Sequence, residues 1–138
     1  MAKNNRLNLY MSALCMMFSS ASYANDCTLA EQSTTDETKK YIQCLDKEIA
    51  SLERSQQTWI TKLTLDLGKI QDDTGNTQLM PIFKRSIKSQ TRFLEDSCRW
   101  RYLQKMPNAT QAAIVYKRCE IAILEQHIEV LKQPLKLF

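Results

Sequence analysis

The amino-acid sequence predicts an all-α fold, a small antiparallel bundle of about three helices held together by two disulfide bonds. Helix-breaking residues are few, because the 138 residues include only 2 glycines and 3 prolines. Apolar residues recur at spacings of three and four over long stretches, which is the period of a helix with one buried face. The part of the chain after residue 24 holds four cysteines, an even number that is typical of disulfide-bonded exported domains.

The first 24 residues have the pattern of a cleavable signal peptide. Lys3 and Arg6 precede an apolar run, and the small residues before Asn25 fit cleavage after Ala24. The run is shorter than the about 20 residues that a membrane span needs, so we expect no stable membrane insertion after cleavage. Lipid attachment at Cys15 is not expected, because a small residue normally precedes a lipid-modified cysteine and this chain has a leucine there.

Residues 25–138 are then expected to form a single domain in the periplasm or outside the cell. Cleavage removes two basic residues and no acidic residue, which lowers the formal charge from +4 to +2. A nearly neutral chain gives no support for nucleic-acid binding, which normally uses a strongly basic domain or stripe. A domain of this length is expected to have one hydrophobic core.

The first helix is expected to follow a cap at Ser33, Thr34 or Thr35 and to run for about 35 residues, or about 50 Å. Since so long a helix exceeds an ordinary globular one, we expect a kink near Gly68 or an earlier end. Residues 72–76 have the composition of a turn. The residues that follow the helical spacing are Ile42, Leu45, Ile49, Leu52, Gln56, Trp59, Leu63, Asp66 and Ile70.

Two further helices are expected on either side of Pro107. The second begins near Pro81, a residue tolerated in a first helical turn, and ends before Pro107. The third begins with Asn108 as its cap and stops at Pro134. In the second helix the expected inward residues are Ile82, Phe83, Ile87, Leu94, Cys98 and Leu103, and in the third they are Ala112, Val115, Cys119, Ala122, Ile123 and Val130.

The cysteine positions favour two local bridges. Residues that face each other in an antiparallel hairpin lie at equal distances from its turn. The midpoint between Cys98 and Cys119 falls at the turn before the third helix, and the midpoint between Cys27 and Cys44 falls at the cap of the first helix. A Cys44 to Cys98 bridge, which leaves Cys27 with Cys119, is the alternative. No metal site is expected, since no two of these cysteines are two to four residues apart and the chain has a single histidine.

The sequence shows no catalytic device, and we expect no enzyme activity and no cofactor. A nucleophile with a histidine base would have only His127 to use, and this residue is expected at a helix surface or core edge. Two glycines cannot build a phosphate-binding loop. The acidic pair Asp72 and Asp73 is expected to be a solvated turn.

Positive charge is concentrated on the second helix. A solvated basic face is one interpretation, and a docking surface for an anionic partner such as an envelope polymer, a lipid headgroup or an acidic protein is the other. Trp100 and Tyr102 interleave with the arginines, a combination that binding centres favour, although Trp59 and Trp100 could equally fill the core. The basic residues are Lys84, Arg85, Lys88, Arg92, Arg99, Arg101 and Lys105, against which stand only Glu95 and Asp96.

Three segments together with the four cysteines resemble the lysozyme inhibitor LprI-like family of bacterial envelope proteins. The segments are TKKYIQCLDKEIASLERSQQTW, SQTRFLEDSCRW and YKRCEIAILEQHIEVLK. The strongest elements are the cysteine positions and Leu45, directly after the second cysteine. The family usually has an aromatic residue followed by Arg-Asp where this chain has Phe93, Leu94 and Glu95, and a tryptophan where it has Gln90. The chain therefore resembles a divergent member.

The resemblance implies a helical, disulfide-bonded, periplasmic or secreted protein that binds another protein. It points to a lysozyme or another cell-wall hydrolase as the partner. Animal lysozymes are basic, so an inhibitor steered to one of them would be expected to be acidic, unlike the second helix here. The alternatives are a periplasmic immunity protein against a delivered toxin and a structural or stress protein of the envelope that binds an anionic partner.

Overall fold

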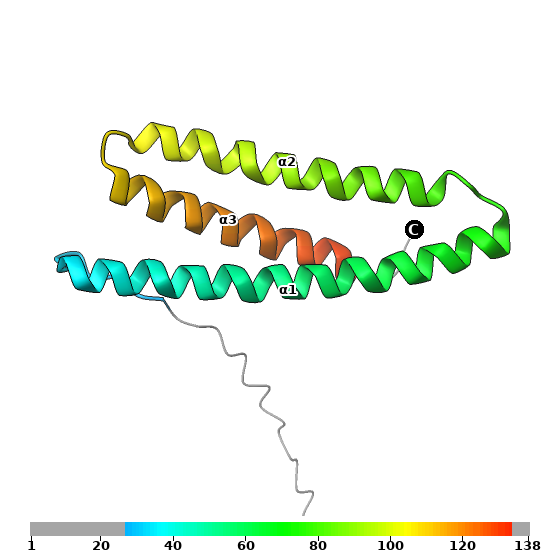
Figure 1. Ribbon diagram of the computed structural model, residues 1–138, viewed down its shortest axis with the longest axis horizontal. Helices are drawn as coiled ribbons and strands as arrows, with labels where there is room; N and C mark the ends of the chain where they lie inside the picture. Colours follow the sequence, from blue (N-terminus) through cyan, green and yellow to red (C-terminus); the bar gives the residue numbers. More distant parts are fainter. Residues whose placement is uncertain (1–26, 134–138) are drawn as a thin grey trace, which may run out of the picture.

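The structure, a computed structural model that describes residues 27–133, is a bundle of three antiparallel helices. The helices are α1 (Thr35–Thr74), α2 (Leu79–Lys105) and α3 (Ala109–Lys132), and residues 27–133 contain no strand. Figure 1 shows α3 lying between the two longer helices, α1 and α2. The predicted all-α fold of three helices is confirmed. The predicted signal peptide and Cys15 lie outside the described residues.

The α1 helix is fixed at its start by a capping box. The backbone N–H of Glu37 donates to the Thr34 hydroxyl at 3.3 Å, and the backbone N–H of Thr34 donates to the Glu37 carboxylate at 2.7 Å. These two bonds satisfy backbone donors that the first turn of a helix leaves free. The Glu37 carboxylate also accepts from the Thr34 hydroxyl at 2.8 Å, and the bonds that it accepts from the backbone and then the side chain of Thr34 lower its pKa.

The α1 helix continues through Gly68 to Thr74, so the earlier end was a wrong prediction, whereas the kink near Gly68 stays a prediction. A glycine inside a helix costs only about 1 kcal/mol, and burial of the neighbouring Leu63 and Leu67 offsets this cost. The helix ends at Thr74, where Gly75 adopts the left-handed conformation with φ 71°. The Gly75 N–H donates to the Gln71 carbonyl at 2.8 Å, which closes the last turn.

The boundaries of the other helices agree closely with the sequence. The α2 helix begins two residues before Pro81 and ends at Lys105, before Pro107. Asn108 caps α3, since its side-chain oxygen accepts from the backbone N–H of Gln111 at 3.0 Å. The α3 helix ends at Lys132, and the stop predicted at Pro134 lies outside the described residues.

The core forms two clusters at opposite ends of α3, because this helix packs against both others along its length. One cluster joins Tyr41 and Leu45 of α1 to Ile114 of α3. The other joins Leu63 and Leu67 of α1 to Leu131 of α3, with partly buried residues of α2 packed against it. The α1 and α2 helices contact each other over a much smaller area, so α3 holds the bundle together.

Part of the predicted inward face was wrong. On α2, Ile82 and Leu103 are 52% and 60% exposed, and on α3 Val130 is 56% exposed. A single buried stripe was assumed for each helix, whereas α3 lies between two neighbours and buries residues on two sides. Ala122 and Ile70 are exposed as well. The residues of α3 that are in fact buried are Ala112, Ile114, Leu124, Ile128 and Leu131.

Within residues 27–133 we find no helix with the length and apolar character required to cross a membrane.

Candidate functional site

The two local disulfide bonds predicted from the cysteine spacing are confirmed. Cys27 is bonded to Cys44 with their Cα atoms 5.8 Å apart, and Cys98 is bonded to Cys119 with their Cα atoms 5.5 Å apart. The first bond holds the N-terminal arm against α1, and the second joins α2 to α3. Cys98 is completely buried, and the other residues of α2 are partly or fully exposed. The position of α2 on the bundle therefore depends strongly on this bridge.

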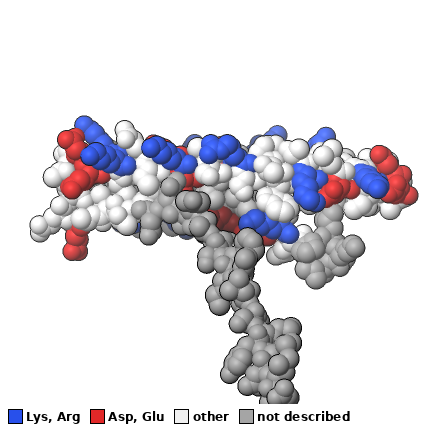
Figure 2. All heavy atoms as spheres, turned by 90° about the horizontal axis from the view of Figure 1, so that it is seen from below, with Lys and Arg blue, Asp and Glu red and all other residues white. Residues whose placement is uncertain are grey.

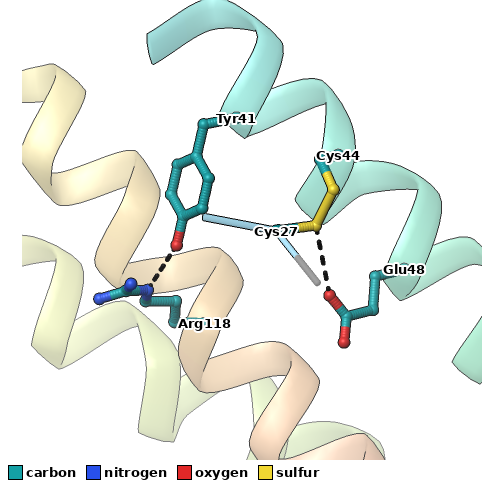
Figure 3. The surroundings of a disulfide bond; sticks show 5 residues. All are labelled: Cys27, Tyr41, Cys44, Glu48 and Arg118. Carbon is teal, nitrogen blue, oxygen red and sulfur yellow. Dashed lines mark hydrogen bonds between the residues drawn. A yellow bond between two sulfur atoms is a disulfide. The ribbon is translucent and has the colours of Figure 1, made fainter. Parts of the chain in front are cut away.

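The surroundings of the first bridge join three parts of the fold. Figure 3 shows the Tyr41 ring of α1 pointing toward Arg118 of α3, close to the disulfide. The Arg118 guanidinium donates to the Tyr41 hydroxyl at 2.7 Å, and its central carbon lies 5.6 Å from the centre of the ring. A carboxylate oxygen of Glu48 lies 3.6 Å from the Cys27 sulfur. The arm, α1 and α3 are thus fixed to one another at this end of the bundle.

Five basic residues predicted for the second helix lie together on its outer side, and we call them the basic outer face. At 3.6 residues per turn their side chains fall within an arc of about 100°, and they extend about 22 Å along the helix. Arg85, Arg92 and Arg99 repeat every seven residues, so they stand two turns apart. All five side chains are exposed. The residues of the basic outer face are Lys84, Arg85, Lys88, Arg92 and Arg99.

No carboxylate within residues 27–133 forms an ion pair with the basic outer face. The four ion pairs in the described part of the chain involve α1 and α3 only. Glu95 lies within the same arc and lowers the formal charge of this side of α2 from +5 to +4, and the remaining positive potential extends about 10 Å into solvent. An anionic partner that approaches this face would therefore be attracted before contact.

Arg101 and Lys105, which the sequence grouped with the other basic residues, do not belong to this face. Their positions place them on the opposite flank of α2, toward the side that packs on α3. The Arg101 guanidinium donates to the Ser97 carbonyl, and its central carbon lies 4.2 Å from the centre of the Trp100 ring. Arg101 is therefore partly buried and engaged within its own helix.

A stripe of exposed apolar residues runs beside the basic outer face. Ile82, Phe93 and Trp100 share one side of α2, and Leu103 lies between this side and the arginines. These four side chains are 52% to 60% exposed. Single exposed apolar residues are ordinary, but a set gathered on one helix marks an interaction surface. Sequence reasoning missed this stripe. A helical projection of α2 would have found it, because the four residues project from a different side of the helix than Ile87, Leu94 and Cys98, which face the bundle.

The outer side of α1 provides a contrast with α2. Lys40, Lys47 and Arg54 repeat every seven residues, as the arginines of α2 do. Figure 2, which views the molecule from the α1 side, shows basic groups in a row with acidic groups between them and at both ends. The acidic residues of α1 are Asp36, Glu37, Asp46, Glu48, Glu53, Asp66, Asp72 and Asp73. With eight acidic and six basic residues α1 has a small negative charge, whereas α2 has seven basic and two acidic residues.

Two titratable groups of α3, His127 and Glu120, are partly buried, and this burial shifts their pKa values. Gln56 donates to Nδ1 of His127 at 2.8 Å if the proton of the ring is on the other nitrogen, and burial lowers the pKa of His127. Burial, and after it the nearby carboxylate of Glu53, raises the pKa of Glu120. In residues 27–133 no group of three or more His, Cys, Asp or Glu side chains is placed to hold a metal ion.

Comparison with protein-family models, curated proteins and solved structures gives no match for this chain.

Proposed function

We propose that this chain is a non-enzymatic binding protein that docks an anionic protein partner on the outer side of α2. The observation that carries the proposal is the unpaired basic outer face beside four exposed apolar side chains. Charge of this kind raises association rates and selects partners by complementarity. Tryptophan and arginine are the residues that most often supply the affinity of a protein interface, and Trp100 and Arg99 are neighbours here.

The expected partner is a cell-wall hydrolase with an acidic surface. The resemblance to LprI-like envelope proteins supports a hydrolase of the lysozyme type. The charge of α2 narrows this expectation, because a basic animal lysozyme would be repelled from the basic outer face while an acidic hydrolase would be attracted to it. The two disulfides are compatible with an oxidising compartment, and export to the periplasm by a signal peptide at residues 1–24 is part of the proposal.

A panel of lysozymes and bacterial wall hydrolases, chosen to span acidic to basic surfaces, tests this function. We expect the oxidised protein to inhibit acidic members in a dose-dependent way. A sample that is reduced and alkylated should lose the inhibition, because α2 then loses the disulfide that holds it against α3 and stays joined to α3 only through their turn. Absence of inhibition throughout the panel, with the oxidised protein folded by near-ultraviolet circular dichroism, would contradict a hydrolase partner.

An anionic envelope polymer is the second candidate, and the even spacing of the arginines over about 22 Å of α2 favours it. A polymer needs the charges and makes little use of the exposed apolar stripe. Its binding should weaken steeply with salt and should be unaffected by Trp100→Ala. A protein partner, in contrast, should lose affinity about tenfold or more with Trp100→Ala, since truncation of a central tryptophan removes much of the buried contact.

A further inference from the structure

An open groove of about 490 Å³ lies between α2 and α3, near the end of the bundle where these helices are joined by their turn. A volume of this size is within the range of sites that hold small organic molecules. The groove shares Leu103 with the exposed apolar stripe and Arg99 with the basic outer face, and its other four lining residues belong to neither. Its lining residues are Arg99, Tyr102 and Leu103 of α2 and Ala113, Tyr116 and Lys117 of α3.

The walls of the groove are mainly apolar and aromatic. The rings of Tyr102 and Tyr116 meet edge to face, with centres 6.4 Å apart and planes at 84°. Both tyrosines are partly buried, and Leu103 is 60% exposed beside them. Ala113 contributes a small side chain that leaves room between the helices. A flat apolar group in the groove could therefore contact side chains of α2 on one side and of α3 on the other.

The polar groups of the groove favour a negative charge. Arg99 and Lys117 are both cationic, and no carboxylate lines the groove. Lys117 forms an ion pair with Asp46 of α1, whereas Arg99 has no ion-pair partner among residues 27–133. An anionic group at the mouth of the groove would therefore meet a free guanidinium, which can donate two parallel hydrogen bonds.

The Tyr116 hydroxyl adds a donor to the same site. Burial, and then the carboxylates of Glu120 and Glu95, raise the pKa of Tyr116, so its hydroxyl keeps its proton over the physiological range. The two carboxylates line a separate cleft that shares only Tyr116 with the groove. Arg99 and Lys117 act on the pKa of Tyr116 in the opposite direction to the two carboxylates. The protonated hydroxyl therefore lies between the cationic groove and the acidic cleft and is a donor available to an acceptor on the groove side.

The groove is held in shape by the second disulfide. Cys98 is adjacent to Arg99, and Cys119 is two residues from Lys117. The bridge keeps the two walls at a fixed separation beside the cationic groups. A preformed site loses less entropy on binding than one that must be ordered by its ligand.

We propose that the groove between α2 and α3 binds a small apolar molecule, preferably aromatic, that carries a single anionic group. The apolar part lies between Tyr102, Tyr116 and Leu103, and the anion lies at Arg99. This site does not depend on the docking function of α2, and either can fail without the other.

Two dyes with the same anilinonaphthalene scaffold test the proposal on the oxidised protein. One, 1-anilinonaphthalene-8-sulfonate, carries a sulfonate, and the other, N-phenyl-1-naphthylamine, is neutral. We expect the anionic dye to bind more tightly, and Arg99→Gln to weaken its binding at least about tenfold, as loss of a charged hydrogen bond does. Arg92→Gln is the matched control, because it removes the same charge from the same exposed side of α2 without lining the groove.

A second variant tests the location. Ala113→Phe should fill the groove and abolish binding of both dyes, and chemical shifts of the oxidised wild type on dye addition should be largest at Ala113, Tyr116 and Lys117. An unchanged near-ultraviolet spectrum shows that the dye does not report a loosened core. The proposal is overturned if Arg99→Gln and Arg92→Gln weaken the anionic dye equally. Shifts that are spread over α1, or equal affinity for the two dyes, would overturn it as well.

Discussion

Removal of the bridge between α2 and α3 should destabilise the protein more than any other conservative change. The Cys98→Ala/Cys119→Ala variant opens a loop with a sequence separation of 21. In the chain-entropy model this change costs about 3.3 kcal/mol of unfolding free energy. A domain of this size has an unfolding entropy of about 0.22 kcal/mol per kelvin, so the melting temperature should fall by about 15 °C. The assay is thermal and urea denaturation followed by circular dichroism.

The first bridge provides the matched control. Cys27→Ala/Cys44→Ala opens a loop with a sequence separation of 17, for which the same model gives about 3.1 kcal/mol. The two variants differ in burial, because Cys98 is completely buried and the first pair is partly exposed. Loss of the buried sulfur adds about 1 kcal/mol to the α2–α3 variant, so its total expected decrease in melting temperature rises from the entropic value of about 15 °C to about 20 °C, against about 14 °C for the first-bridge variant. Equal melting temperatures for the two variants, or unchanged hydrogen-exchange protection in α2, would refute the idea that α2 depends on this bridge.

Three further substitutions test the local reasoning. Thr34→Ala should lower the unfolding free energy by about 1 kcal/mol in denaturant titrations, and Thr34→Ser should restore it, because the capping bond to Glu37 is lost and regained. The raised pKa of Glu120 means that the protonated carboxyl stabilises the fold below its ordinary pKa of 4.5 and that this stability is lost as pH rises. Glu120→Gln should therefore be more stable than wild type at pH 7 and equal to it near pH 4. The lowered pKa of His127 has the opposite sign, so its contribution is complete above its ordinary pKa of 6.5 and is lost as pH falls. His127→Gln should flatten the decrease in melting temperature below pH 6.5, and an unchanged pH profile would contradict the assignment.

The helix boundaries and the disulfide pairing could be predicted because they depend on local chemistry. Pro107 cannot continue a helix, and Asn108 is a good cap, so the turn between the second and third helices is set by adjacent residues. Once that turn is known, the antiparallel geometry places Cys98 opposite Cys119. The same argument gave the bridge at the first cap.

The buried faces could not be predicted as well, because they depend on how many neighbours each helix has. The sequence does not show that α3 lies in the middle, so Ile114 and Leu124 were missed and Val130 was wrongly placed inside. The positive charge of the candidate site was predicted, but the exposed apolar stripe beside it was not. The basic residues of α2 can be listed from the sequence, and a helical projection separates Arg101 from the others, but its bond to the Ser97 carbonyl and its contact with the Trp100 ring come only from the structure.

The most direct test of the docking proposal compares two triple variants with the same change in charge. Arg85, Arg92 and Arg99 of α2 are replaced by glutamine in one, and Lys40, Lys47 and Arg54 of α1, which have the same spacing, in the other. Inhibition of the most sensitive acidic hydrolase of the panel is titrated with each oxidised protein. We predict that the α2 variant is at least about tenfold weaker and that the α1 variant is close to wild type. Equal weakening by both variants, or a loss confined to the α1 variant, would contradict the assignment of the docking surface to α2.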